Sequence, residues 1–442
     1  MEAIKKQRKK IYYNKFFKLD ERFTGQNSTK KITKILKILI KNKVDAQFIS
    51  SSENIAWLLN IRGNDSKFSP LPNSYLIIDR KKNVNLFCNL KKIDKKLRKK
   101  LKDTKINDIS SIEQFLKNIR HKKIQVDKIS CSIYFKNLLQ KENNIIKKYD
   151  PIYFLKSIKN KIEIKNTIKA HITDGAALTK FLFWIKDNFK KRNITEILAE
   201  NKLLKFRSNN TNFKFLSFPT ISGSGPNGAI IHYKANKKSN RLLQKGDLYL
   251  VDSGGQYSFG TTDVTRTISL DNDNKKIKSI YTRVLKGHIA VASYKLNKKT
   301  TGSDIDFVAR KPLKSIKLDY PHGTGHGVGY FLNVHEGPQG ISKGNKIKLK
   351  EGMILSNEPG YYKPGKFGIR IENLLAIKKI GKFNKFINLT MAPIDKTLIE
   401  KKLLNKTEVQ WINEYHKNVF SNLKNLMNIR ELNQLKVACS NL

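Results

Sequence analysis

The sequence predicts an α/β (α+β) fold made of two units, with the chemistry concentrated in the second. Three observations support this prediction. Amphipathic helical patterns alternate with short apolar runs of strand length from residue 28 onward. The length of 442 residues exceeds that of a typical single domain, which is roughly 100 to 200 residues. All candidate catalytic residues lie between His232 and Glu372.

The first unit is expected to span residues 27–157. It follows a basic segment, residues 1–26, that has no clear periodicity and that we interpret as a tail or the remnant of a linker. The expected elements are a helix in TKKITKILKILIKN, strands in AQFISS, SYLIID and NVNLFC, and a basic amphipathic helix in LKKIDKKLRKKLKD (90–103). Strands that alternate with helices in this way indicate an α/β unit.

The second unit is expected to span residues 158–442. It begins with a long helix over 162–189, in which apolar residues recur at spacings of three and four. A shorter helix in TEILAENKLLKFR, strand-like pieces and a long helix from about 275 to 295 follow. Two strands around ILSNEPG and GIRIENLLAI and a last helix near TEVQWINEYHKNVF complete the expected elements.

The chain is strongly basic, but its charge does not indicate a specific partner. The formal net charge is +52, and lysines occur along the whole chain beside Asn and Ile. This pattern is typical of AT-rich codon usage, so we expect no specific nucleic-acid binding. The three cysteines, Cys88, Cys131 and Cys439, lie far apart and are expected to be reduced thiols. No signal-peptide core or membrane span is evident, and we expect a cytoplasmic protein without membrane attachment.

One glycine pattern imitates a nucleotide-binding loop. SGSGPNG places Gly223, Gly225 and Gly228 in the spacing GxGxxG. A dinucleotide-binding loop must follow a strand and open a helix. Here AIIHY follows and is expected to form a strand, so we interpret the glycines as a turn and expect no organic cofactor.

Four carboxylates at the ends of apolar runs form two pairs. Asp252 ends the run LYLV, and Asp263 begins an alternating strand eleven residues later, so a hairpin brings the two together. Glu358 ends a second apolar run, and Glu372 lies on the polar face of GIRIEN together with Arg370. Carboxylates that are placed so closely repel one another unless a proton or a cation lies between them.

Adding one histidine to the four acids completes a metal site. Carboxylates with a single imidazole and no thiolate suit Mn²⁺ or Co²⁺ more than a zinc-finger type of site. Four acids carry more charge than one divalent ion requires, which indicates two metals bridged by shared carboxylates. Such pairs activate a bridging water for hydrolysis. We therefore expect two divalent ions, Mn²⁺ first, with Co²⁺ or Zn²⁺ as alternatives.

The motifs around these residues resemble those of a known family. GAIIHY, DSGGQYSFGTTDVTRT, HGTGHGVGYFLNVHEGP, NEPGYY and GIRIEN are similar, in order and spacing, to the catalytic motifs of Xaa-Pro aminopeptidases (aminopeptidase P). These are pita-bread metallopeptidases of family M24, which also includes prolidase, methionine aminopeptidase and creatinase. Upstream, NIAWLLNIRGND resembles a block of the creatinase-like N-terminal domain. The resemblance thus implies a creatinase-like α/β domain followed by a pita-bread catalytic domain.

The resemblance also implies a role for each site residue. The metal ligands would be Asp252, Asp263, His326, Glu358 and Glu372, with Asp263 and Glu372 bridging both ions. The catalytic groups would be His232, His322 and His335, which hold the substrate and stabilise the oxyanion, and Glu358, which passes a proton to the leaving nitrogen. Tyr362 and Arg370 would contact the ligand carboxylates and fix their orientation without binding the metals themselves. The substrates would be peptides with proline in the second position, and the protein would be a homodimer.

Two alternatives to this function remain open at the level of sequence. A prolidase would use the same metal cage on Xaa-Pro dipeptides. A non-catalytic pita-bread scaffold that binds nucleic acid or a protein is favoured by the basic charge and opposed by the complete ligand set. Long members of the family carry two similar domains before the catalytic one. Residues 1–157 have room for one, plus a short remnant such as LDERFTGQ.

Overall fold

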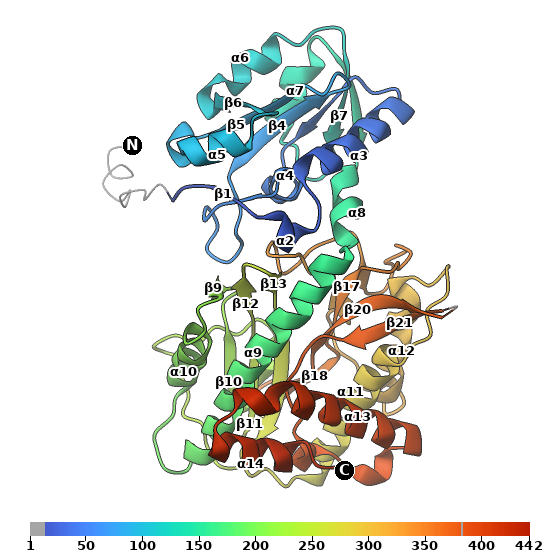
Figure 1. The fold of residues 1–442 in the computed structure, drawn as a ribbon. Helices are drawn as coiled ribbons and strands as arrows, with labels where there is room; N and C mark the ends of the chain where they lie inside the picture. The colour runs from blue at the N-terminus through green and yellow to red at the C-terminus, as the bar shows by residue number, and fades with distance from the viewer. Residues whose placement is uncertain (1–13, 382) are drawn as a thin grey trace. The chain divides into compact units, whose positions relative to one another are not determined.

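The computed structural model describes residues 14–381 and 383–442, and the chain divides into two compact units (Figure 1). The first ends at Lys156, and the second runs from Ser157 to Leu442. Each unit has its own sheets and its own hydrophobic core. Within the described residues, no helix is both long enough and apolar enough to cross a membrane.

The first unit contains a six-stranded mixed sheet in the order β6-β5-β4-β2-β7-β8. The central pairs β2–β4 and β4–β5 are antiparallel, and the outer pairs β5–β6, β2–β7 and β7–β8 are parallel. The strands are β2 (Ala46–Ile49), β4 (Ser74–Asp79), β5 (Val84–Cys88), β6 (Lys105–Asp108), β7 (Lys123–Asp127) and β8 (Asn144–Lys148). The predicted strands in AQFISS, SYLIID and NVNLFC are confirmed.

Short helices precede, connect and follow these strands. They are α3 (Ser28–Lys41), α4 (Ser52–Leu59), α5 (Lys95–Lys100), α6 (Ile112–Lys117), α7 (Ile133–Gln140) and α8 (Pro151–Ser157). The basic helix predicted over 90–103 is shorter than expected, since Asp94 caps α5 by accepting a hydrogen bond from the Leu97 N–H. A separate 3-10 turn, Leu90–Lys92, precedes that cap. A local cap thus divides a region in which the apolar periodicity is continuous.

The interpretation of residues 1–26 as a tail is wrong for the part from Phe16 onward, whereas residues 1–13 lie outside the described residues. Strand β1 (Phe17–Lys18) pairs with β3 (Ile61–Arg62), and the short helix α2 (Glu21–Thr24) follows. Phe16 and Leu19 are buried in the first unit. These isolated apolar side chains anchor the segment without producing a periodic pattern, which is why the sequence did not reveal it.

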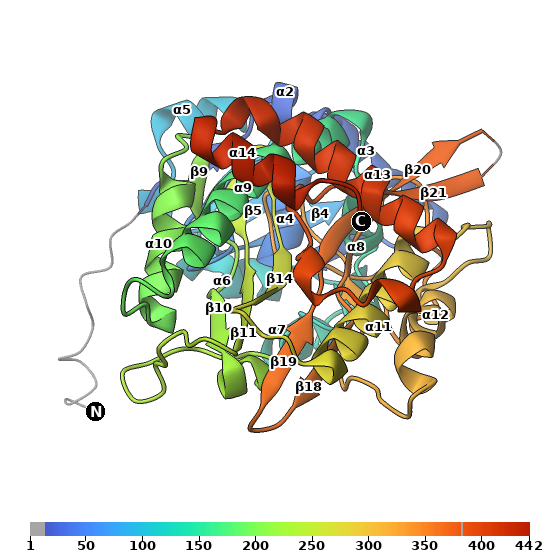
Figure 2. The same ribbon diagram turned by 90° about the horizontal axis from the view of Figure 1, so that it is seen from below.

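The second unit begins with the long helix α9 (Lys161–Asn188), close to its predicted bounds. Asn160 and Glu163 form a capping box at its start. The other helices are α10 (Glu196–Ser208), α11 (Lys275–Ala292), α12 (Gly302–Lys314), α13 (Lys406–Leu423) and α14 (Ile429–Ala438). In Figure 2, α13 and α14 lie beside α9, and α11 lies beside α12.

Antiparallel strands form the inner part of the second unit. One sheet joins β10 (Ile221–Ser224), β11 (Leu248–Ser253) and β14 (Val264–Ser269). Another joins β17 (Ile354–Asn357), β20 (Asn373–Ile380) and β21 (Phe383–Asn388). Smaller pieces are β18 (Gly360–Lys363) with β19 (Phe367–Arg370), β15 (Gly325–His326) with β16 (Gly340–Ile341), and β9 (Phe213–Leu216) with β12 (Gly255–Tyr257) and β13 (Gly260–Thr261).

Two strand predictions in this unit need correction. The expected strand in AIIHY is absent, because residues 225–229 form a 3-10 turn and the chain then continues irregularly. The glycines of SGSGPNG do lie in a turn, as predicted. The single strand expected in GIRIENLLAI is two strands, since β19 pairs with β18 whereas β20 pairs with β17. The chain changes sheets at Ile371 and Glu372.

The core of the second unit also contains neutral histidines. His416 on α13 is fully buried, and its Nε2 accepts a hydrogen bond from the Ile394 N–H at 3.1 Å. Burial, together with the nearby charges of Lys396 and Arg266, lowers the pKa of His416 to about 3. This imidazole therefore stays uncharged in the folded protein at neutral pH.

Candidate metal centre

The two aspartates meet at the end of the β11–β14 pair. Asp252 on β11 is paired in register with Thr265 on β14, and Asp263 immediately precedes β14. The loop between them contains β12 and β13, so the connection is longer than a tight hairpin. Both aspartates are buried, with 8% of Asp252 and 3% of Asp263 exposed. The antiparallel register therefore brings the predicted pair together.

The two glutamates come from the other sheet. Glu358 follows β17, and its backbone N–H donates to the Thr324 carbonyl at 2.8 Å. Glu372 lies at the change of sheets between β19 and β20, and its N–H donates to the Thr265 carbonyl at 3.1 Å. The Thr265 hydroxyl donates to Glu372 Oε2 at 2.7 Å. These bonds join Glu372 to β14, the strand that begins directly after Asp263.

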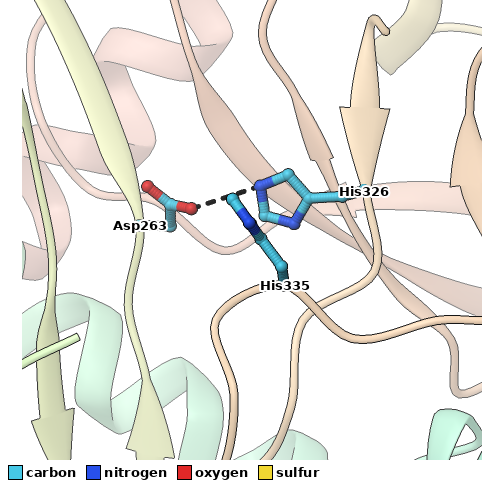
Figure 3. Close-up of side chains that lie close together, drawn as sticks. All are labelled: Asp263, His326 and His335. Atoms are coloured by element: carbon cyan, nitrogen blue, oxygen red, sulfur yellow. Dashed lines mark ion pairs between the residues drawn. The ribbon is translucent and has the colours of Figure 1, made fainter. Parts of the chain in front are cut away.

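His326 on β15 points its ring toward Asp263 (Figure 3). Its Nδ1 lies 2.9 Å from the Gly327 carbonyl, to which it donates. Its Nε2 then has a free lone pair, which lies 3.4 Å from Asp263 Oδ2 and 3.5 Å from Glu358 Oε1. The imidazole nitrogen and the two carboxylate oxygens therefore all offer lone pairs to the same region. This is the arrangement of a cation site.

A glycine next to His326 allows this approach. A Cβ on Gly325 would lie 2.0 Å from the Ser356 carbonyl oxygen. The His326 N–H also donates to the Ser356 hydroxyl at 2.8 Å. The contact between β15 and β17 thus depends on the absence of a side chain at residue 325.

The potential ligand atoms form three overlapping sets of three, each with all its atoms within 4.8 Å of one another. The sets are Asp252–Asp263–Glu372, His326–Glu358–Glu372 and Asp263–His326–His335. The first two together contain all five predicted ligands, and they share Glu372. An arrangement of two adjacent groups with a common carboxylate fits two neighbouring divalent ions.

The electrostatics of the acids also fit cations. Burial raises the pKa of Asp263 well above its usual range, and the charge of Asp252 raises it further. Burial likewise raises the pKa of Glu372 well above its usual range, with Asp263 adding to the effect. Asp252 Oδ1 is buried and lacks a hydrogen-bond partner within the described part of the chain. An unpartnered carboxylate oxygen in a buried acidic cluster suits a metal ligand.

Arg370 and Tyr362 support the acids from one side. The Arg370 guanidinium donates to Asp252 Oδ2 at 2.7 Å, to the Thr265 hydroxyl at 3.1 Å and to the Tyr362 hydroxyl at 2.7 Å. The Tyr362 hydroxyl in turn lies 2.8 Å from His322 Nε2. Arg370 is only 2% exposed, so its charge acts in a site of low polarity and fixes the orientation of Asp252.

The acids and histidines line a cavity of about 450 Å³. His232, His322 and His335 all contribute to its wall, and an apolar part is formed by Phe218, Pro219, Ile221 and Ile231. The ring centres of His326 and His335 are 4.1 Å apart. Burial lowers the pKa values of His322 and His335 to about 4, so both rings are neutral at pH 7 and each has a single N–H. The N–H of His322 donates from Nδ1 to the Gly323 carbonyl at 2.8 Å.

Every residue proposed from the sequence as a ligand, a catalytic group or a supporting group therefore lines this cavity or contacts a residue that does. Sequence reasoning missed the hydroxyl groups that hold the acids in place. Thr265 bonds Glu372, and Ser356 donates to Glu358 Oε1 at 3.0 Å. Thr265 lies on the same face of its strand as Asp263, and this alternation was the only available signal. Ser356 had none.

Comparison with known proteins identifies the family. Residues 165–379, which include the whole cluster, match metallopeptidase family M24. Residues 7–163 match the creatinase/prolidase N-terminal domain, and residues 382–442 match the C-terminal region of peptidase M24. The chain is 41% identical to Xaa-Pro aminopeptidase 1 of Dictyostelium discoideum, over 96% of this chain and 70% of that protein. It belongs to metallopeptidase family M24. The resemblance inferred from the motifs is confirmed, as is the order of a creatinase-like domain followed by the M24 domain.

Further relatives agree with this assignment. A probable Xaa-Pro aminopeptidase P of Laccaria bicolor is 39% identical over 97% of this chain and 69% of its own length. The crystal structure of X-prolyl aminopeptidase from Caenorhabditis elegans, described as a cytosolic enzyme with a di-nuclear active site, superimposes with a TM-score of 0.94 at 31% identity, covering 100% of this chain and 75% of that one. The prolidase from Pyrococcus horikoshii has a TM-score of 0.67 at 26% identity, covering 83% of this chain and 99% of that one.

Proposed function

We propose that this M24 protein is an Xaa-Pro aminopeptidase that hydrolyses the bond between an N-terminal residue and a following proline. The observation that carries the proposal is the convergence of four carboxylates and one imidazole at a cavity in the segment that matches M24. The relatives named Xaa-Pro aminopeptidase match more than nine-tenths of the chain.

The proposed metal ligands are Asp252, Asp263, His326, Glu358 and Glu372, with Asp263 and Glu372 shared between two divalent ions. The overlap of the two sets that contain only proposed ligands supports the sharing of Glu372, which belongs to both. The sharing of Asp263 is proposed from the family resemblance. Mn²⁺ is the proposed native metal, since a site rich in carboxylates with one imidazole suits it, and Co²⁺ or Zn²⁺ are the alternatives. Bound divalent ions would supply an activated water and polarise the substrate carbonyl.

The histidines of the cavity hold and polarise the substrate in this proposal. His335 and His232 donate N–H groups to the oxygen that becomes negatively charged as the carbonyl is attacked, and His322 holds the peptide. The low pKa of His335, about 4, supports its role as a neutral donor at working pH. Because such donors are fixed before the reaction, they favour the transition state over the substrate.

Glu358 is the proposed proton carrier. Burial raises the pKa of Glu358, which makes its carboxylate a better proton acceptor near neutral pH. It accepts a proton from the attacking water and passes it to the proline nitrogen as that group leaves. The nitrogen requires this proton because it can leave only as a neutral amine, and the proline nitrogen, which carries no hydrogen in the peptide, thereby becomes a secondary amine. The apolar wall formed by Phe218, Pro219 and Ile231 suits a pyrrolidine ring.

The proposal includes two further attributes, a cellular location and an oligomeric state. A cytoplasmic location follows from the likeness to the C. elegans protein, which is described as cytosolic. A homodimer is proposed from the family resemblance. We propose no specific nucleic-acid partner, since the site chemistry accounts for the matched motifs without one.

The test is peptide cleavage after removal of metals. The protein is treated with a chelator, and release of the first residue from Arg-Pro-Pro and from Gly-Pro is measured without added metal and with added Mn²⁺, Co²⁺ or Zn²⁺. Cleavage of the tripeptide that depends on Mn²⁺ is the expected result. Cleavage of the dipeptide alone would identify a prolidase. If neither peptide is cleaved with any of the three metals, the proposed function is wrong.

A further inference from the structure

A buried ion pair next to the cavity has no part in the function described so far. Lys159 Nζ lies 2.5 Å from Glu336 Oε1, and the two residues are 177 positions apart in the chain. The exposed fractions of the side chains are 1% for Lys159 and 0% for Glu336. Ionised groups are rarely buried so completely, and removing one member of such a pair is strongly destabilising.

Glu336 connects the pair to two site histidines. It directly follows His335 in the chain, and its backbone N–H donates to the Gly327 carbonyl at 2.8 Å. The same carbonyl accepts the hydrogen bond from His326 Nδ1. A Cβ on Gly327 would lie 2.1 Å from the Glu336 carbonyl oxygen, so this close contact requires glycine. Movement of Glu336 would therefore change the position of His335, its direct neighbour in the chain.

The backbone at Lys159 is fixed by its neighbours on both sides. Its N–H donates to the Gly352 carbonyl at 2.8 Å, and the preceding Ile158 forms an isolated bridge with Met353. Met353 directly precedes β17, the strand that leads to Glu358. On the other side, Lys159 precedes the Asn160 cap of α9. The ammonium group thus projects from a fixed point toward Glu336.

We propose that Lys159 is a positioning residue for the reaction, which acts through Glu336 to hold the His335 imidazole toward the scissile carbonyl. This inference rests on the proposed function, because it assigns His335 the role of oxyanion donor. Without the ammonium group, the Glu336 side chain loses the 2.5 Å contact that fixes its position, so it shifts and the His335 backbone moves with it. The donor is then misplaced, whereas the groups that bind the substrate stay in position.

The first test is a double-mutant cycle in which kcat and KM are measured. Lys159→Met removes the charge and keeps most of the side-chain volume. It is expected to lower kcat by about 10- to 100-fold, the usual effect of losing a group that orients a reacting residue, with KM changed less than about threefold. In a His335→Ala background the same change is expected to lower kcat by less than about threefold, because the donor on which it acts is already absent. An equal loss in both backgrounds would overturn the proposal.

A matched control and a second variant keep the cycle interpretable. Lys186→Met removes another lysine of the second unit, which pairs with Asp395 at 2.8 Å outside the cavity lining, and should leave kcat within about twofold. If Lys159→Met does not fold, Glu336→Gln enters the same cycle, with the same expected loss of kcat and the same insensitivity in the His335→Ala background. A loss of kcat in Lys186→Met equal to that in Lys159→Met would attribute the effect to general destabilisation and overturn the assignment.

A second readout is independent of turnover. The imidazole signals of ¹³C-histidine-labelled, metal-free protein are assigned to His335 by comparison with His335→Ala. Lys159→Met is expected to shift the His335 signal toward that of a solvent-exposed imidazole, because the ring loses its edge contact with His326, whereas Lys186→Met should leave it unchanged. An unshifted signal would refute the positioning role even if peptides are cleaved. A shifted signal in a protein that cleaves no Xaa-Pro peptide would instead refute the proposed function alone.

Discussion

Substitution of Glu372 by Gln is expected to stabilise the metal-free protein and to remove most of the stabilisation that bound metal supplies. In the metal-free protein, ligand oxygens of Asp252, Asp263 and Glu372 all lie within 4.8 Å of one another. Two unit charges at that distance repel by about 3.5 kcal/mol at an effective dielectric constant of about 20. Removing one charge of three relieves two of the three repulsions. The Thr265 hydroxyl can still donate to the amide oxygen of Gln, so little is lost in exchange.

The net gain is smaller than the sum of the repulsions. The raised pKa of Asp263 means that the metal-free cluster takes up a proton more readily, which already relieves part of the strain. We therefore expect Glu372→Gln to stabilise the metal-free protein by about 1 to 3 kcal/mol, a fraction of the Coulomb total. Each kcal/mol corresponds to roughly 2 to 4 °C in Tm for a domain of 150 to 250 residues.

The assay is thermal unfolding of both proteins, after chelation and again with excess Mn²⁺. Metal at 100 times its Kd stabilises a folded site by about 2.7 kcal/mol, and Glu372→Gln should lose most of this gain. The matched control is Glu414→Gln, an exposed glutamate on α13, for which a change within about 0.5 kcal/mol is expected in both conditions. A lower Tm for Glu372→Gln in the metal-free state would refute the idea that repulsion dominates the empty cluster.

Three further changes test other parts of the structure. Arg370→Met removes the 2.7 Å ion pair with Asp252 and should lower kcat/KM by about 10- to 100-fold in a steady-state peptide assay; an unchanged value would contradict the supporting role of Arg370. Gly325→Ala places a Cβ 2.0 Å from the Ser356 carbonyl oxygen and should cost about 1 to 3 kcal/mol in denaturant unfolding, together with weaker Mn²⁺ binding in a metal titration. The His416 contribution to stability is fully present above its unfolded pKa of about 6.5 and is lost as the pH falls toward its folded pKa of about 3, by about 2 kcal/mol at pH 5. Unfolding of His416→Gln, which has no group that titrates there, should depend less on pH over this range, and an identical slope would show that His416 is not responsible.

Local patterns were sufficient to predict most elements. The 3.6-residue periodicity of α9 and the apolar runs of β2, β4 and β5 reflect burial of one helical stripe or of a central strand, and such burial leaves a direct trace in the sequence. Elements stabilised by a few distant contacts left no such trace. Strand β1 is extended because it pairs with residues 61 and 62, and residues 229–233 are apolar without forming a strand.

The chemical identity of the candidate centre followed from the sequence, because ligand type depends on the residues themselves. Four acids with one histidine, in motifs similar to those of M24 peptidases, predicted a hard metal site before any geometry was known. Which hydroxyl groups support the acids, and which buried lysine neutralises Glu336, were decided only by the tertiary structure. These partners are more than 100 residues apart in the pairs Thr265–Glu372 and Lys159–Glu336. Hydrogen bonds and ion pairs across such separations depend on strand register and side-chain burial, neither of which a local pattern specifies.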